Sequence, residues 1–190
     1  MSIIYDEAQK TITLHTRNTT YQMQVDKYGF LLHLYYGKTA EGCMDYLLTY
    51  YDRGFSGNPY DAGNDKTYSM DSLPQEFPSL GTGDYRTPAC IIKNTDRTYC
   101  SDFRYESHSI RDGKYALEGL PAVYADDDEA QTLEVVLEDR VTGVQAVLLY
   151  GVLPEYDIIT RSVKIVNASD GRISVKKLAP ACLDMVGGQY

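Results

Sequence analysis

Hydrophobic and polar residues alternate with a period of two along much of this chain. The clearest stretches are residues 11–15 (TITLH), 21–25 (YQMQV), 133–135 (LEV), 163–165 (VKI) and 172–176 (RISVK). Such alternation is typical of antiparallel strands that have one face in a core and the other in solvent. More continuous apolar runs, at residues 30–36 and 144–150, predict strands in the centre of a sheet.

Turn signals separate these segments. The Asp-Gly pairs at 112–113 and 170–171 predict tight hairpins, in which glycine supplies a positive φ, and Thr-Gly at 142–143 marks another turn. No helical periodicity is sustained, although residues 43–51 are a candidate for one short helix. Many short strands with frequent turns predict an all-β fold, a large antiparallel sandwich.

One long segment, residues 37–88, breaks the pattern. It has no strong alternation and contains most of the chain's prolines and many of its glycines. A compact domain rarely carries so long an irregular segment without a use. We therefore expect a lid, a binding loop or an interface, with a plain excursion that covers a sheet face as the alternative.

A second excursion, residues 112–130, contains the acidic run DDDE at 126–129. A calcium site needs oxygen ligands that are spaced along the chain, usually with a glycine at the turn. Four consecutive acidic residues lack that spacing, so the run predicts a solvated turn. The four cysteines form no Cys-x-x-Cys pair, which argues against zinc. We expect no metal and no cofactor.

Composition and net charge limit the classes of binding partner that we expect for this protein. The net charge is −9, and this argues against nucleic acid and against anionic membrane surfaces, because both attract clustered Lys and Arg. The start of the chain, MSIIYDEAQK, lacks a basic region followed by an apolar run, and no segment is long enough to cross a bilayer. These features predict a cytoplasmic protein with reduced cysteines. The 18 tyrosines suit either half-buried strands or sugar contacts.

The sequence shows no clear group of catalytic residues. Several acidic residues of the long segment are candidates, but no two have a spacing that favours a catalytic pair: Asp52, Asp61, Asp65, Asp71, Glu76 and Asp84. The three histidines form no arrangement with Ser or Cys that indicates a nucleophile. Asp84 and Arg86 are two residues apart and would lie on one side of an extended chain, so we predict an ion pair that fixes the loop.

Several motifs occur in order along nearly the whole chain. They are LYYGK at 34–38, DRGFS at 52–56, LPQEFP at 73–78, GDYR at 83–86, DFRY at 102–105 and GLPA at 119–122. Together they resemble the amino-terminal domain of glycoside hydrolase family 36 α-galactosidases. The resemblance implies a β-sandwich of the supersandwich type beside a (β/α)₈ barrel, with both catalytic aspartates on the barrel.

The resemblance therefore implies that residues 1–190 form one domain without catalytic residues, cut short at its carboxyl end. The barrel would follow downstream in the same polypeptide. The full-length parent would be a retaining α-galactosidase that hydrolyses terminal α-galactosyl residues of the melibiose and raffinose type. An independent carbohydrate-binding module and a purely structural interaction domain are the alternatives.

The resemblance also suggests a use for the long segment. In tetrameric members, this domain lends a loop to an active site, where an Asp contacts galactose hydroxyls. Asp52, with Arg53 and Phe55 beside it, matches that motif best. A carboxylate can accept two strong hydrogen bonds from sugar hydroxyls. The alternative is that Asp52 only pairs with Arg53 or caps a turn. Expected partners are the barrel, further copies in a tetramer, and α-galactosides.

Overall fold

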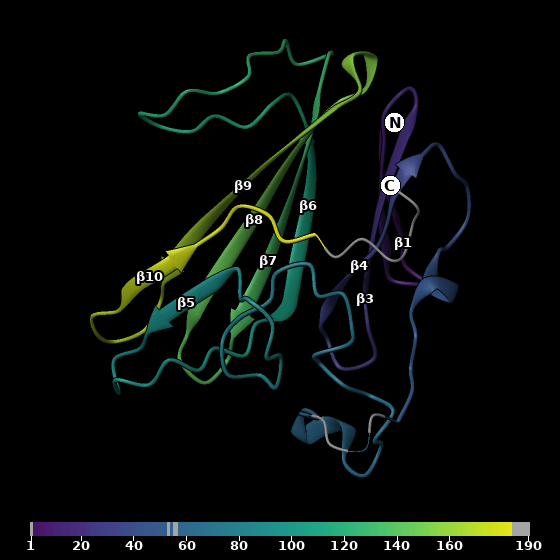
Figure 1. Ribbon diagram of the computed structural model, residues 1–190. Helices are drawn as coiled ribbons and strands as arrows, with labels where there is room; N and C mark the ends of the chain where they lie inside the picture. Colours follow the sequence, from purple (N-terminus) through teal and green to yellow (C-terminus); the bar gives the residue numbers. More distant parts are fainter. Residues whose placement is uncertain (1, 53, 55–56, 184–190) are drawn as a thin grey trace.

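The computed structural model describes residues 2–52, 54 and 57–183 and is an all-β protein built from antiparallel sheets (Figure 1). The first sheet has the order β1-β2-β3-β4, with bounds Ile3–Asp6, Thr11–His15, Thr19–Val25 and Leu31–Lys38. The second has the order β6-β7-β8-β9, with bounds Arg104–Asp112, Gln131–Asp139, Val144–Leu153 and Ile158–Asn167. A small third sheet pairs β5 (Cys90–Lys93) with β10 (Ser174–Leu178).

The main core lies between the two four-stranded sheets. Alternate residues of β2, such as Ile12 and Leu14, point into it and meet alternate residues of β7, such as Leu133 and Val135. All four side chains are fully buried. The period-two pattern therefore arises, as predicted, from strands that have one face in the core. The predicted antiparallel β-sandwich is confirmed.

Helical structure is minor in the described part of the chain. It consists of three 3₁₀ turns: η1 (Asp45–Leu47), η2 (Tyr60–Ala62) and η3 (Pro154–Tyr156). The short helix expected within residues 43–51 is thus a single 3₁₀ turn. None of the described helices is long and apolar enough to cross a membrane. The four cysteines form no disulfide.

The two continuous apolar runs occupy different positions in their sheets. Residues 144–150 begin β8, which lies inside its sheet as predicted. Residues 30–36 contribute to β4, the last strand of its sheet, beside which lies a short bridge to Gln75 instead of a full strand, so the prediction of a central strand is wrong there. Leu32 shows why β4 is nevertheless apolar: it points away from the main core into a second hydrophobic cluster with Tyr68 and Met70. Both faces of β4 are buried over residues 31–34, which removes the alternation there.

The long irregular segment is anchored to the first sheet by two legs. The first leg follows the outer polar face, where Gln22 Nε2 donates to Gly42 O (3.0 Å) and Met44 N donates to Gln22 Oε1 (2.8 Å). The returning leg supplies Tyr68 and Met70 to the second cluster. Next along the chain, residues 74–76 extend the sheet beyond β4 by backbone hydrogen bonds. The segment covers part of a sheet face, and most of the described residues between its legs are exposed, including Tyr46 and Tyr60.

Two hairpin predictions are wrong. Gly113 does have a positive φ of 80°, but it leads into an excursion of the chain up to Ala130 instead of directly into β7, and Figure 1 shows this excursion projecting from one end of the sandwich. Asp-Gly at 170–171 joins β9 and β10, which belong to different sheets. Thr-Gly at 142–143 does close the β7–β8 hairpin, with Gly143 at φ 72°. An Asp-Gly or Thr-Gly pair therefore predicts that the chain turns, but it does not predict which strand the next strand pairs with.

Candidate functional site

The exposed part of the long segment carries the residue that the sequence singled out, Asp52. Its Oδ1 atom accepts a hydrogen bond from the backbone N–H of Gly54 (2.7 Å), and its side chain is exposed. Arg53 and Phe55, predicted to accompany it, lie outside the described residues. One carboxylate oxygen of Asp52 thus caps a local turn, and the carboxylate as a whole remains accessible to a ligand.

Tyrosines surround this exposed loop. Tyr46 and Tyr60 are exposed by 73% and 99%, and Tyr50 is about half exposed. Tyr50 stacks on the buried ring of Tyr68, with centroids 6.2 Å apart. Tyr68 in turn donates its hydroxyl hydrogen bond to Asp26, which holds the loop to the sheet. Burial, followed by the Asp26 hydrogen bond, raises the pKa of Tyr68 above its ordinary value, so the phenol stays a proton donor.

Asp84 and Arg86 come together in the returning leg. Arg86 Nε donates to Asp84 Oδ1 (2.9 Å), and Nη2 donates to Asp84 Oδ2 (2.8 Å), which is the bidentate geometry that favours arginine. The Arg86 Nη2 group also donates to the backbone oxygens of Met70 (3.1 Å) and Leu73 (2.7 Å). Gln75 Nε2 donates to Asp84 Oδ2 (2.9 Å). The pair therefore joins three stretches of the segment, as a loop-fixing pair would.

Replacing Arg86 with Lys should loosen this leg. A lysine ammonium cannot reproduce the planar fork, so buried Asp84 would lose one of its paired bonds at a cost of about 1–3 kcal/mol. We expect faster amide hydrogen exchange in residues 57–88, with little change in β7 and β8. Arg17→Lys is the matched control, because Arg17 and its partner Glu155 are both mostly exposed. Equal effects of the two substitutions on residues 57–88 would contradict this role.

A buried ion-pair network, not anticipated from the sequence, joins the two sheets. At its centre is Glu76, whose side chain has no exposed surface. Its carboxylate accepts hydrogen bonds from Tyr21 of β3 (2.7 Å) and Tyr150 of β8 (2.6 Å), and it lies 2.6 Å from Arg161 Nη1 of β9. His33 Nδ1 of β4 is 3.5 Å away. The five residues come from separate parts of the sequence, and no local pattern links them.

The charges of this network are set by its neighbours. Burial alone would raise the pKa of the Glu76 carboxyl, but the guanidinium of Arg161 and contacts with His33 and Tyr150 outweigh it and hold that pKa below its usual value. Burial, and then the adjacent carboxylate, raise the pKa of both Tyr21 and Tyr150. Glu76 is therefore a carboxylate locked between the sheets, out of reach of a substrate, and its role is structural.

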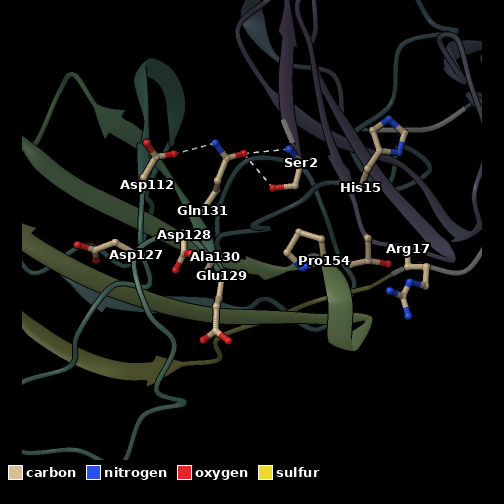
Figure 2. Close-up of a pocket in the computed structure, with 11 residues that line it drawn as sticks. Ser2, His15, Arg17, Asp112, Asp127, Asp128, Glu129, Ala130, Gln131 and Pro154 are labelled. Carbon is tan, nitrogen blue, oxygen red and sulfur yellow. Dashed lines mark hydrogen bonds between the residues drawn. The ribbon is translucent and has the colours of Figure 1, made fainter.

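A cleft of about 700 Å³ lies at the end of the sandwich where the second excursion begins (Figure 2). Asp127, Asp128 and Glu129 of the acidic run line one side, and His15 and Arg17 line the other. Between them, Gln131 accepts a hydrogen bond from Ser2 N (2.9 Å) and donates one to Asp112 (3.0 Å). In the described part of the chain, no three His, Cys, Asp or Glu side chains are grouped closely enough to hold a metal ion.

Comparisons with known proteins agree with one another. Residues 29–190 match the glycosyl hydrolase family 36 N-terminal domain. The whole chain is 60% identical to part of the bifunctional alpha-galactosidase/sucrose kinase AgaSK of Mediterraneibacter gnavus, covering 20% of that protein. Over 99% of the chain, it is 38% identical to alpha-galactosidase Mel36A of Lactobacillus acidophilus, covering 26% of that protein.

Solved structures give the same picture. The galactosidase domain of AgaSK superimposes with a TM-score of 0.94 and 61% identity, over 95% of this chain and 25% of that one. The alpha-galactosidase AgaA variant A355E D548N of Geobacillus stearothermophilus, in complex with raffinose, gives a TM-score of 0.84 and 35% identity over 89% of this chain. The present chain spans only about a quarter of these structures.

Proposed function

Because the chain belongs to glycoside hydrolase family 36, as that family's N-terminal domain, we propose that it is the non-catalytic β-sandwich of a full-length α-galactosidase. The parent protein hydrolyses terminal α-galactosyl residues of the melibiose and raffinose type with retention of configuration. Support for the substrate class comes from relatives named alpha-galactosidases, and from AgaA variants in complex with raffinose and stachyose. The chemistry belongs to a (β/α)₈ barrel downstream.

The contribution of this domain to the sugar pocket is the Asp52 loop. The observation that carries this proposal is an exposed carboxylate held out on a loop whose two legs are fixed, by Gln22 on one side and by the Asp84–Arg86 pair on the other. A carboxylate on a loop with anchored legs loses less conformational entropy on accepting hydroxyl hydrogen bonds than one on a free chain. Asp52 thus contacts galactose in a pocket that other parts of the assembly complete.

The domain also supports the barrel and contributes to a homo-oligomer, a tetramer, in which loops such as this one reach a neighbouring site. A cytoplasmic location is part of the same proposal. It is supported by four cysteines without a disulfide and by a net charge of −9, which disfavours anionic membranes.

Hydrolysis of a nitrophenyl α-galactoside tests whether this domain is non-catalytic and the rest of the parent protein carries the activity. Residues 1–190 alone are expected to give no hydrolysis above the buffer rate, while the full-length parent turns the substrate over. Purified fragment that releases nitrophenol, with activity that follows the fragment through chromatography, would contradict a non-catalytic domain.

A carbohydrate-binding module is the second candidate, and the exposed tyrosines near Asp52 favour it. Such a module needs an aromatic surface and polar groups within one domain, and the chain has both near Tyr60. The two functions are compatible, since a domain can lend Asp52 to one pocket and hold a sugar of its own in another.

A further inference from the structure

We propose that a pocket of about 330 Å³, between η2, the Gly81–Gly83 turn and the start of β6, is a binding site for a neutral saccharide. Its polar lining comes from Asp61, Asp102 and Arg104, and Tyr60 stands at its rim. Asp52 is not among its residues. The proposed function enters only in the choice of α-galactosides as the first ligands to test.

The floor of the pocket is a fixed plane of alternating donors and acceptors. Arg104 Nε donates to Asp102 Oδ1 (2.7 Å), and Nη2 donates to Asp102 Oδ2 (2.9 Å) and to Asp61 Oδ2 (3.1 Å). Arg104 Nη1 donates to Tyr28 O (2.6 Å), and the guanidinium carbon lies 3.7 Å from the centroid of the Phe30 ring. Five contacts thus hold one guanidinium, so the floor is preorganised for a ligand.

The two carboxylates of this floor retain hydrogen-bonding capacity. Their side chains are exposed by 49% (Asp61) and 43% (Asp102) although both pair with Arg104. A carboxylate offers about four acceptor positions, and Arg104 occupies only some of them. Vicinal hydroxyls of a sugar could donate to the remaining positions, and charge-assisted bonds of this kind are strong.

The wall of the pocket is closely packed backbone. A Cβ atom added to Gly57 would lie 2.6 Å from Gly83 Cα, and one added to Gly81 would lie 2.7 Å from Cys100 Sγ, so the turn has no room to collapse or shift. Gly81 and Gly83 both have positive φ, 99° and 89°. Such a turn keeps the wall in place without a side chain filling the pocket.

The rim supplies the apolar element that sugars require. The Tyr60 side chain is 99% exposed, which is extreme for a residue of this size. An exposed ring beside a planar network of donors and acceptors matches a pyranose, which presents C–H groups on its face and hydroxyls at its edge. The net charge of the three ionic residues is −1, which disfavours anions. The described residues contain no group of three metal-binding side chains here or elsewhere, which disfavours a cation.

Titration of the chain with raffinose and with melibiose, by calorimetry or ligand-observed NMR, tests the site. Saturable binding in the millimolar range is expected for the unmodified chain. Tyr60→Ala should weaken it about tenfold and Tyr60→Phe by less than about twofold, because stacking uses the ring and not the hydroxyl. Asp102→Asn should also weaken it. Tyr85→Ala is the matched control, since Tyr85 is 76% exposed and does not line the pocket.

Three results would overturn the assignment: no saturable binding of either sugar, equal binding by the Tyr60→Ala and unmodified chains, or saturable binding of Ca²⁺ that Asp102→Asn abolishes. Tyr85→Ala should leave binding by this chain unchanged, and a loss as large as that of Tyr60→Ala would place the sugar elsewhere. These outcomes are independent of turnover in the parent enzyme, so failure of this site leaves the proposed role of Asp52 standing.

Discussion

Replacing Arg161 with Met should lower the free energy of unfolding by about 3–5 kcal/mol, because removal of one partner leaves a buried charge uncompensated. The Arg161 side chain is 10% exposed, and its Nη1 atom is 2.6 Å from the fully buried carboxylate of Glu76. Arg161 Nη2 also donates to the backbone oxygen of Glu76 (2.9 Å). Urea denaturation at neutral pH, followed by circular dichroism, measures the change.

A surface ion pair provides the control. Arg140 and Glu106 are 3.1 Å apart but exposed by 72% and 44%, so Arg140→Met should change the stability by no more than about 1 kcal/mol. The double variant Arg161→Met with Glu76→Gln should recover part of the loss, since it removes the stranded charge as well. Similar losses for Arg161→Met and Arg140→Met would show that Glu76 tolerates the loss of its cation.

The same network gives stability a dependence on pH with a definite sign. The folded-state pKa of Glu76 is held below the unfolded value, which is about 4.3 for a free glutamate. A group of this kind contributes its full stability above the unfolded pKa and loses it as the pH falls through the folded pKa. The Glu76→Gln variant should therefore lose less stability than the unmodified chain when the pH is lowered from neutral through this range.

The alternation of hydrophobic and polar residues predicts where the strands lie, but it does not predict which strands pair with each other. The alternation at residues 11–15 coincides with β2, and that at 133–135 falls within β7, because a strand with one buried face carries its own signature. Pairing depends on contacts between distant segments instead. The turn at 170–171 separates two sheets, and β4 lies at an edge although it reads as central. Neither fact is encoded within the strands concerned.

Contacts between polar residues are likewise predictable when the residues are close in the sequence and unpredictable when they are distant. Asp84 and Arg86 are two residues apart, so their pairing follows from chain geometry and can be anticipated from the sequence. The carboxylate of Glu76 gathers side chains from both sheets, and neither spacing nor composition identifies its partners. In the sequence, Glu76 stands between Gln75 and Phe77, and this local setting does not distinguish a buried carboxylate from an exposed one.

Replacing Asp52 with Ala in the full-length parent should lower kcat/KM for raffinose by roughly ten- to a hundredfold, which is the expected cost of removing hydrogen bonds to a charged group. The reason is that the exposed carboxylate, capped by Gly54 N, is proposed to accept galactose hydroxyls. Steady-state kinetics gives the change. Size-exclusion chromatography with light scattering should find the oligomeric state unaltered, because the hydrogen bond that Asp52 accepts lies within its own turn.

Two further substitutions separate sugar contact from turn formation. Asp52→Asn keeps an oxygen that can accept from Gly54 N but loses the charge, so it should preserve the loop while activity still falls. Asp96→Ala is the control, because Asp96 likewise accepts a bond from a backbone N–H two residues on, that of Thr98 (2.9 Å), in a turn far along the chain. If Asp52→Asn and Asp52→Ala both retain full kcat/KM, the loop contributes only scaffolding to the enzyme.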